Sequence, residues 1–167
     1  MVLYVASSLD GYIAGPKGEI DWLFHDQDYG YNEFFATIDT VVMGRKTWEL
    51  SRSFGPWPYG KAKSYVFSRT MYGESDERSI FVHEEIGPFI RQLKNQPGRD
   101  IWLVGGGQIT LEVLKEDLVD EFVISIHPIL LGGGIPMFPP GFPRIKLKFA
   151  GSQDYGSGLC QLTYERA

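Results

Sequence analysis

The sequence predicts an α/β protein built on one mostly parallel sheet with an antiparallel C-terminal edge. Short apolar runs typical of buried strands alternate with helical apolar spacing over residues 1–115, and strand patterns dominate afterwards. Such alternation favours parallel strands, because each helix carries the chain back to the edge where the next strand begins. The 167 residues show no repeat, low-complexity tract or linker, so we expect a single domain over residues 1–167.

The N-terminal part is predicted to hold a strand, a long loop and a helix. Residues 2–7 form an apolar run typical of a buried strand. The glycine-rich loop of residues 8–22, which we call the flap, follows directly, and a long loop at this place is typically mobile. Residues 28–38 then repeat apolar side chains at helical spacing, which predicts a helix.

The middle of the chain is predicted to continue the alternation. Its apolar strands span residues 41–43, 64–69 and 79–83. The first of them ends at Gly44, and a helix begins near Lys46 or Thr47. Residues 87–98 form another helix, with a proline near its start and a Pro-Gly stop.

The C-terminal part adds two strands and a closing hairpin. Residues 101–104 form a strand that ends at three glycines, and a helix follows. Residues 120–130 read as a strand, which His127-Pro128 brings to an end. A loop rich in glycine and proline spans residues 131–143, after which two alternating segments indicate a hairpin.

The glycine triplet at residues 105–107 follows a strand and precedes a helix, which is where α/β proteins bind ligands. A helix N-terminus offers unpaired N–H groups and the positive end of a dipole. Glycine removes the Cβ that would keep a phosphate away from this backbone. The triplet lacks the G-x-G-x-x-G spacing of the Rossmann fingerprint, so a tight turn without a ligand stays an open alternative.

Two further strand ends carry matching chemistry. The first comprises Gly44, Arg45, Lys46 and Thr47. The second adds a hydroxyl and a cation, Ser68 and Arg69, and the planar fork of arginine suits phosphate oxygens. Taken alone, the segment of residues 44–47 is explained as a solvated helix start, and Arg69 as a surface charge. Together, three such ends in one sheet predict a ligand with several phosphates, such as a dinucleotide.

Composition excludes several classes of partner. A net charge of −5 and a pI near 5.2 argue against nucleic-acid binding. The single cysteine, Cys160, permits no intrachain disulfide and suits a reducing compartment. We find no signal-peptide pattern and no run approaching the ~20 apolar residues of a membrane span, so we expect a cytoplasmic protein without a membrane partner. The histidines lack metal-ligand spacing, so we expect no metal.

Four separated motifs resemble dihydrofolate reductase in order and spacing. They are ASSLDGYIAG (6–15), VVMGRKTWE (41–49), SYVFSR (64–69) and IWLVGGGQI (101–109). A further stretch, HPILLGGGIPMF (127–138), is similar to the reductase domain of bacterial riboflavin biosynthesis, the RibD C-terminal type. The resemblance implies a three-layer, dihydrofolate reductase-like fold with about eight strands and with helices on both faces of the sheet.

The resemblance also implies NADPH as the cofactor. Ala6 and Ile13 would lie near the nicotinamide, and the turn of residues 44–47 would hold the phosphate side. Ser68 and Arg69 would flank the adenosine, where a cation selects the 2′-phosphate of NADPH. The residues that would pass under the pyrophosphate are Gly105, Gly106, Gly107, Gln108 and Ile109. In this fold the glycine pair adopts a cis peptide, which we expect between Gly105 and Gly106 or beside them.

The catalytic acid is less well defined. Dihydrofolate reductase has a carboxylate at the start of the helix before VVMGR, and Asp28 falls at about this place, although outside the expected Leu-Pro context. Asp28 is therefore a candidate acid, and a helix N-cap is its alternative role. Asp10 in the flap is a second candidate, with an Asx turn as its alternative.

These features predict an NADPH-dependent reductase that transfers hydride to a small heterocyclic or ribosylamino-pyrimidine substrate. The nearest named activity is that of 5-amino-6-(5-phosphoribosylamino)uracil reductase in riboflavin biosynthesis. A non-catalytic nucleotide-binding module and a true dihydrofolate reductase are the alternatives. The resemblance further implies a homodimer. Residues 136–143 form either its contact surface or a loop packed on its own domain.

Overall fold

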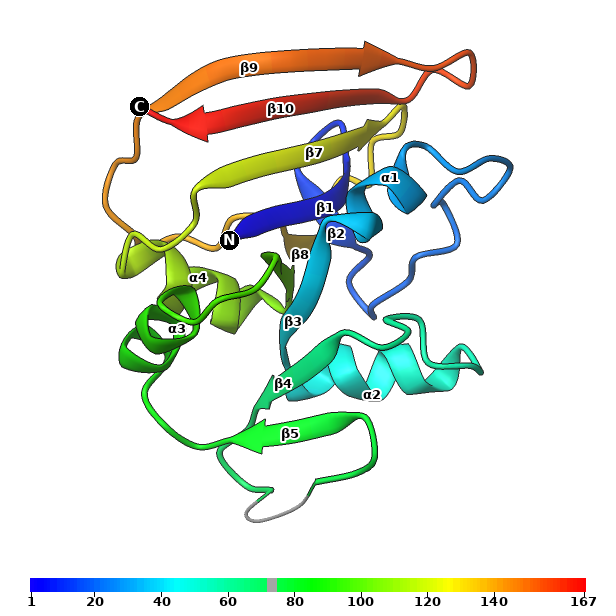
Figure 1. Cartoon of the computed structure of the whole chain (residues 1–167). Helices are drawn as coiled ribbons and strands as arrows, with labels where there is room; N and C mark the ends of the chain where they lie inside the picture. Colours follow the sequence, from blue (N-terminus) through cyan, green and yellow to red (C-terminus); the bar gives the residue numbers. More distant parts are fainter. Residues whose placement is uncertain (72–74) are drawn as a thin grey trace.

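An eight-stranded sheet forms the centre of the chain in the computed structural model, which describes residues 1–71 and 75–167 (Figure 1). Its strands, in chain order, are β1 (Val2–Ser8), β3 (Ile38–Gly44), β4 (Lys63–Phe67), β5 (Ser79–Val82), β6 (Asp100–Gly105), β7 (Glu121–His127), β9 (Leu147–Asp154) and β10 (Cys160–Arg166). A separate small sheet pairs β2 (Tyr12–Ala14) with β8 (Ile135–Pro136). The helices are α1 (Tyr31–Ala36), α2 (Arg45–Ser53), α3 (Ile86–Lys94) and α4 (Gly107–Lys115).

The strand order of the main sheet is β5-β4-β3-β6-β1-β7-β10-β9. All pairs from β5 to β7 are parallel, whereas β10 runs antiparallel to both β7 and β9. The prediction of a mostly parallel sheet with an antiparallel C-terminal edge is therefore confirmed. β9 and β10 follow each other in the chain and are joined by a short turn without a helix between them (Figure 1).

Helices cover the two faces of the sheet, as Figure 1 shows. Successive side chains of β3 point to opposite faces. Val42 belongs to a buried cluster with Ile90 of α3 and Val113 of α4. Met43 belongs to a second cluster with Trp48 of α2. Each fully buried aliphatic side chain of this kind contributes about 1.5–3 kcal/mol. The predicted three-layer arrangement is confirmed.

The helix predicted over residues 28–38 is shorter than its apolar spacing indicated. α1 ends because Thr37 donates both its N–H and its hydroxyl to the carbonyl oxygen of Phe34, at 3.0 and 2.8 Å. Ile38, whose side chain completed the helical spacing, is the first residue of β3 and is buried in the core. Across residues 1–71 and 75–167, no helix is long and apolar enough to cross a membrane.

Two strands also end earlier than predicted. The strand expected over residues 64–69 stops at Phe67, so Ser68 and Arg69 lie beyond it. The strand expected over residues 120–130 stops at His127. Pro128 follows, and a proline cannot donate the N–H that would extend the ladder.

The flap is attached to the loop of residues 131–143 through the pairing of β2 with β8. A Cβ on Gly134 would overlap the carbonyl oxygen of Ala14, so a side chain at this position would push the two loops apart. In the same loop, Phe138 and Phe142 pack against the core cluster of α3 and α4. Residues 136–143 thus pack on their own domain through these two side chains, and the predicted contact with a second copy stays a prediction.

Candidate functional site

The carboxyl ends of five parallel strands lie along one edge of the sheet. β4, β3, β6, β1 and β7 are neighbours in this order, and parallel strands end at the same edge. The residues at or directly after these ends are Ser68, Gly44, Gly105, Ser8 and His127. All three strand ends that the sequence marked as phosphate-binding therefore come together on this edge.

The two glycine turns contact each other in the middle of this edge. A Cβ on Gly106 would lie 3.1 Å from the hydroxyl oxygen of Thr47 and 3.9 Å from the Cα of Gly44. A Cβ on Gly44 would lie 3.9 Å from the carbonyl oxygen of Gly105. The turns meet because β3 and β6 pair in parallel, with Met43 opposite Gly105. Side chains here would fill the space between the two turns.

The backbone at the triplet needs glycine. Gly105 has a φ of 115° and Gly106 a φ of 89°, both in the region that residues with a Cβ rarely adopt. The expected cis peptide at Gly105–Gly106 is not found: no peptide bond of residues 1–71 and 75–167 is cis. The two positive φ angles turn the chain into α4 instead. The N-terminus of α4 thus begins beside that of α2.

The turn after β3 carries two exposed cations at the start of α2. Arg45 forms an ion pair with Glu49 at 2.9 Å, one helical turn along, and both side chains are nearly half exposed. Lys46 is exposed, and Thr47 is half-buried toward Gly106. An exposed pair of this kind contributes little to stability, so Arg45 can exchange its partner for an anionic ligand at low cost.

The strand end after β4 uses its hydroxyl locally. The Ser68 hydroxyl accepts the N–H groups of Thr70 and Met71, at 3.3 and 3.2 Å. Its carbonyl oxygen lies 2.8 Å from Nδ1 of His83. Ser68 therefore shapes the turn that presents Arg69, whose side chain is exposed.

Two residues that were predicted to pass under the pyrophosphate lie in the first turn of α4, one of them buried and the other exposed. Ile109 is buried, with its Cγ2 atom 3.8 Å from the position of a Cβ on either Gly44 or Gly106. Gln108 is exposed. A Cβ on Gly107 would lie 3.3 Å from Pro139, so the loop of residues 131–143 passes beside the helix N-terminus.

The predicted nicotinamide residues lie on neighbouring strands of the two sheets. Ala6 is half-buried on β1, opposite Ser125 of β7, and Ile13 is half-buried on β2. Beside Ala6, the side-chain amide of Gln161 donates to the Ser125 hydroxyl at 3.0 Å and to the Tyr4 hydroxyl at 3.2 Å. The sequence interpretation missed this polar row. Its signal was a serine and a glutamine within otherwise apolar strand patterns.

The Asp10 carboxylate accepts hydrogen bonds from within the flap and from the loop of residues 131–143. It accepts the Ser8 hydroxyl at 2.6 Å and the N–H groups of Leu131 and Gly132 at 3.1 and 2.7 Å. The Ser8 hydroxyl bond and these backbone bonds lower the pKa of the Asp10 carboxyl. Asp10 joins the flap to the loop of residues 131–143. Its predicted catalytic role remains a prediction. The Asx turn is not formed, because the N–H of Tyr12, which such a turn would use, donates to the Ser8 hydroxyl at 2.9 Å.

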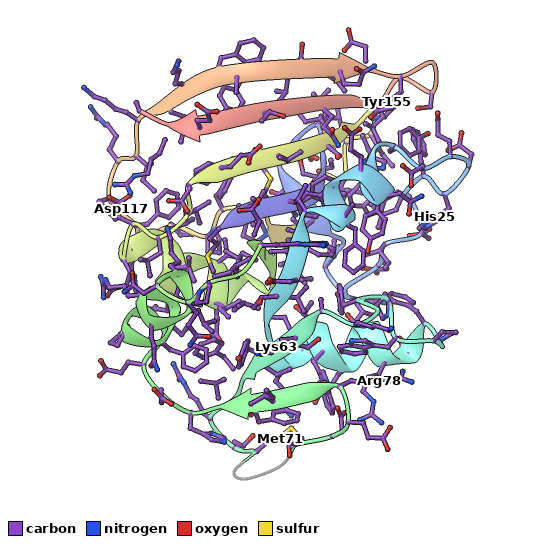
Figure 2. The ribbon with its side chains drawn as sticks, in the orientation of Figure 1. His25, Lys63, Met71, Arg78, Asp117 and Tyr155 are labelled. Carbon is purple, nitrogen blue, oxygen red and sulfur yellow. The ribbon has the colours of Figure 1, made fainter. Side chains whose placement is uncertain are left out.

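Asp28 lies two residues before Gly30, which is the N-cap residue of α1, so the N-cap alternative for Asp28 is wrong. Its two carboxylate oxygens lie 3.1 and 3.3 Å from the N–H of Asn32, which donates to them. Asp28 thus accepts an N–H of the first turn of α1 from outside the helix. The charge of Asp28 also acts on Tyr31 and Tyr155, and it helps to raise the pKa of both hydroxyls. Figure 2 shows Tyr155, from the β9–β10 turn, on the same side of the molecule as His25.

A cluster of aromatic side chains lies between α1 and the sheet. Tyr4 stacks on Phe34 with 4.1 Å between ring centroids, and Trp102 meets Phe34 edge-on at 5.3 Å. Burial raises the pKa of Tyr31 to about 12, and burial also raises that of Tyr4. These hydroxyls therefore stay protonated at neutral pH, so each can donate a hydrogen bond.

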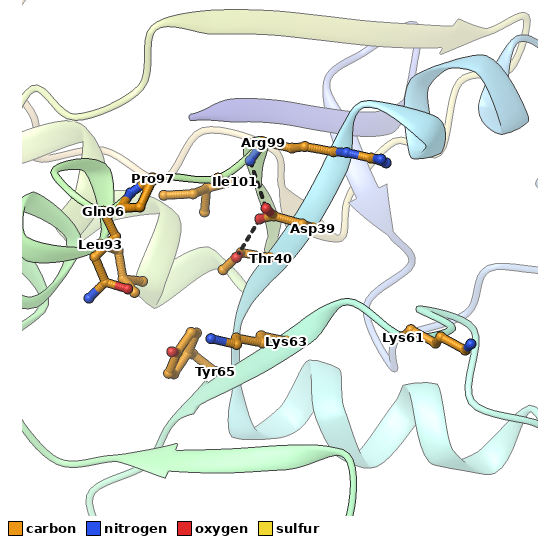
Figure 3. A pocket seen from close by; sticks show the side chains of 11 residues that line it. Asp39, Thr40, Lys61, Lys63, Tyr65, Leu93, Gln96, Pro97, Arg99 and Ile101 are labelled. Atoms are coloured by element: carbon orange, nitrogen blue, oxygen red, sulfur yellow. Dashed lines mark hydrogen bonds between the residues drawn. The ribbon is translucent and has the colours of Figure 1, made fainter.

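A cavity of about 260 Å³ lies at the opposite edge of the sheet, among the starts of β3, β4 and β6 (Figure 3). Asp39 accepts the N–H of Arg99 at 2.6 Å and the hydroxyl of Thr40 at 2.8 Å there. The Arg99 N–H bond is the main cause of the lowered pKa of the Asp39 carboxyl. Figure 3 shows Lys61 directed away from the other labelled residues. This cavity is remote from the glycine turns and does not belong to their site.

Comparison with known proteins agrees with this fold. The sequence model of the RibD C-terminal domain matches residues 1–161. The uncharacterized protein YwjB of Bacillus subtilis (strain 168) is 40% identical over 170 residues, which cover 99% of this chain and 97% of YwjB.

Two solved structures are also similar. A putative riboflavin biosynthesis protein from Shewanella sp. PV-4 has a TM-score of 0.89 and 33% identity, covering 99% of this chain and 98% of the other. A diaminohydroxyphosphoribosylaminopyrimidine deaminase/5-amino-6-(5-phosphoribosylamino)uracil reductase from Thermotoga maritima has a TM-score of 0.76 and 17% identity. That match covers 99% of this chain and 56% of the Thermotoga protein, and it shows the shared fold alone. On the first three findings, the chain belongs to the RibD C-terminal domain family, a family of RibD-like reductases.

Proposed function

We propose that the chain is an NADPH-dependent reductase that transfers hydride to a small heterocyclic or ribosylamino-pyrimidine acceptor. The observation that carries this proposal is the contact between the turns of Thr47 and Gly106, which brings two helix N-termini to one place. Family membership supports the reductase class. The uracil reductase activity named for the Thermotoga relative supports the class of acceptor.

The residues at the two turns fit a pyrophosphate. Gly44 and Gly106 leave a gap that a Cβ would fill, and the N–H groups at the starts of α2 and α4 have no partner within their helices. Arg45, Lys46 and Arg69 are exposed cations on the same edge. A cation there favours NADPH over NADH, because only NADPH carries a 2′-phosphate.

In this proposal the main role of the chain is to position the cofactor and the acceptor relative to each other. NADPH, when bound, supplies the hydride. Ala6 on β1 and Ile13 on β2 would flank the nicotinamide side of the site, two strands away from the Gly44 turn. The flap and the loop after it would exclude water from the acceptor. Asp28 remains the proposed proton donor, for which it would have to give up its bond to Asn32.

Calorimetric titration with NADPH and NADH tests the cofactor. We expect NADPH to bind more tightly, and Arg69→Gln to weaken NADPH binding about tenfold while leaving NADH binding unchanged, since a hydrogen bond to a charged group contributes about 1.5–3 kcal/mol. Arg99→Gln is the matched control, because Arg99 lies at the opposite edge of the sheet. The absence of heat with both nucleotides at millimolar concentration would overturn the proposal.

Oxidation of NADPH with a panel of acceptors then separates the alternatives. Turnover of a ribosylamino-pyrimidine supports the proposed reaction. Nucleotide binding without turnover of any acceptor indicates a binding module. Turnover of dihydrofolate that methotrexate inhibits indicates a dihydrofolate reductase. The aromatic cluster that fills the space between α1 and the sheet argues against a large pteridine there.

We also propose that two copies of the chain pair through β9. Seven of its eight residues are exposed, including Phe149 at 56% and Leu147 at 40%. Among residues 1–71 and 75–167, no strand pairs with its outer edge, and proteins usually cover or charge such an edge. A twofold axis at Gly151 would place Lys148 opposite the partner's Asp154, so an antiparallel pairing of two β9 strands joins opposite charges.

A further inference from the structure

His127 connects the end of β7 to the loop that follows the flap. Its ring is 3% exposed, and Nε2 accepts the N–H of Phe24 at 3.2 Å, across 103 residues of sequence. The parallel register places His127 opposite Ser8, at the carboxyl edge of the sheet and two residues beyond the pair Ala6 and Ser125. The bond therefore lies beside the proposed nicotinamide position.

The two ring nitrogens of His127 have different partners, and these favour one tautomer; the backbone of Ser7 is a further hydrogen-bond partner of the ring. Nε2 faces an N–H donor, so Nε2 must carry the lone pair. Nδ1 lies 3.3 Å from the carbonyl oxygen of Ser125, so Nδ1 carries the proton. Burial lowers the pKa of His127, which favours this neutral form.

Aromatic contacts extend the connection to the residues before α1. Trp22 meets the His127 ring edge-on at 5.2 Å, and Phe24 packs against it at 4.9 Å. Phe24 in turn packs on Tyr29 at 6.3 Å, and the Tyr29 hydroxyl donates to Asp26 at 2.6 Å. The loop of residues 20–28, which we call the acceptor loop, is thus packed around one imidazole.

We propose that His127 is a positioning residue of the reductase site: its neutral Nδ1–H form holds the acceptor loop over the carboxyl ends of β1 and β7. The inference rests on the proposed function only for its effect on turnover. The loop carries Asp28 at its end, so its position determines where this carboxylate stands relative to an acceptor. The glycine turns are on other strands, so His127 acts on the acceptor and not on the phosphates.

Protonation of His127 would break the connection, because Nε2–H would face the N–H of Phe24. The titratable residues on the elements packed around His127 include Asp21, His25, Asp26 and Tyr29 in or beside the loop, Asp10 after β1 and Cys160 on β10. Among them, His25 is the one whose charge contributes to the lowered pKa of His127. The loop should therefore loosen when the pH falls below the titration of His127.

Two substitutions separate the hydrogen bond from simple packing. His127→Gln keeps an acceptor oxygen at about the place of Nε2, whereas His127→Leu keeps only apolar volume. We expect His127→Leu to speed hydrogen exchange of the Phe24 amide at least tenfold and to raise KM for the acceptor more than it lowers kcat. His127→Gln should recover most of both effects, and NADPH affinity should stay within twofold in both variants. Lys61→Gln, at an exposed site at the opposite edge of the sheet, is the control.

Nitrogen NMR of the unmodified protein tests the inference without any variant. An Nδ1–H tautomer with a pKa below the ordinary value of 6.5 is expected, and an Nε2–H tautomer would overturn the inference even if His127→Leu fails to fold. Unchanged Phe24 exchange in a folded His127→Leu would overturn it as well. If no NADPH binds but the tautomer and the exchange behave as stated, then the proposed function fails while the role of His127 in the loop stands.

Discussion

The hydroxyl oxygen of Thr47 lies 3.1 Å from the place where a Cβ on Gly106 would stand. These two residues are far apart in sequence and belong to turns after different strands, β3 and β6. Their proximity makes two separate helix N-termini parts of one site. The predictions below follow from this contact and from the contacts that surround it.

Gly106→Ala should both destabilise the fold and weaken nucleotide binding. Alanine would have to adopt a φ of 89° and would press on Thr47, so we expect a loss of about 1–3 kcal/mol in the free energy of unfolding. Urea denaturation and NADPH calorimetry measure the two effects. Gly156→Ala, where a Cβ meets no atom within 4 Å, should change neither. Equal effects of the two substitutions would contradict the prediction.

Gly134→Ala should separate the flap from the loop of residues 131–143. The new Cβ would overlap the carbonyl oxygen of Ala14, and the φ of 149° already disfavours a side chain. We expect a loss of about 1–3 kcal/mol and faster exchange of the Met137 amide, which donates to Gly11. The adjacent Gly133→Ala meets no atom within 4 Å and should retain the exchange rate of the unmodified protein.

Stability should fall as the pH drops below about 6.5, partly through His127. Its pKa is lowered in the folded state, so the unfolded chain takes up the proton first. The contribution of His127 to the free energy of unfolding is therefore constant above pH 6.5. Below pH 6.5 the free energy of unfolding falls, by no more than about 1.4 kcal/mol per pH unit for this one group. Urea denaturation between pH 5 and 8 should show a flatter profile for His127→Gln. A profile identical to that of the unmodified protein would remove His127 as the cause.

Phe149→Lys should convert the proposed dimer to a monomer. The substitution places a charge on the exposed face of β9, two residues from the proposed twofold axis at Gly151. Light scattering coupled to size exclusion gives the mass directly. Phe54→Lys replaces another exposed phenylalanine, 58% accessible and outside β9, and should leave the mass unchanged. A monomeric mass for the unmodified chain at high concentration would end the proposal.

The sequence predicted the main sheet well, because its signals are local. The apolar run before Gly44 and the run before Gly105 each mark a buried parallel strand, and the glycines mark its end. α1 was predicted too long, since Ile38 suits a helix face and a strand equally. Ile38 belongs to the strand because the helix ends at Thr37. The hydrogen bond from Thr37 to Phe34 that ends the helix has no signature in the sequence.

The contacts that organise the acceptor side could not be predicted, because they join distant segments. Asp10 binds residues 131 and 132, and His127 binds Phe24, yet neither pair is marked by spacing or composition. His127 in particular read only as the end of a strand. The phosphate side was easier to predict, because glycine, arginine and threonine at strand ends carry their chemistry in the sequence itself.

The pairing of β2 with β8 joins the flap to the loop of residues 131–143, and so do the two hydrogen bonds that Asp10 accepts from the N–H groups of Leu131 and Gly132. The two loops should therefore move as one rigid unit. Neither the flap nor the loop of residues 131–143 can move away from the site unless the other moves with it. Opening of the site should therefore be one all-or-none event, with spectroscopic probes at residue 12 and at residue 136 reporting the same rate constant.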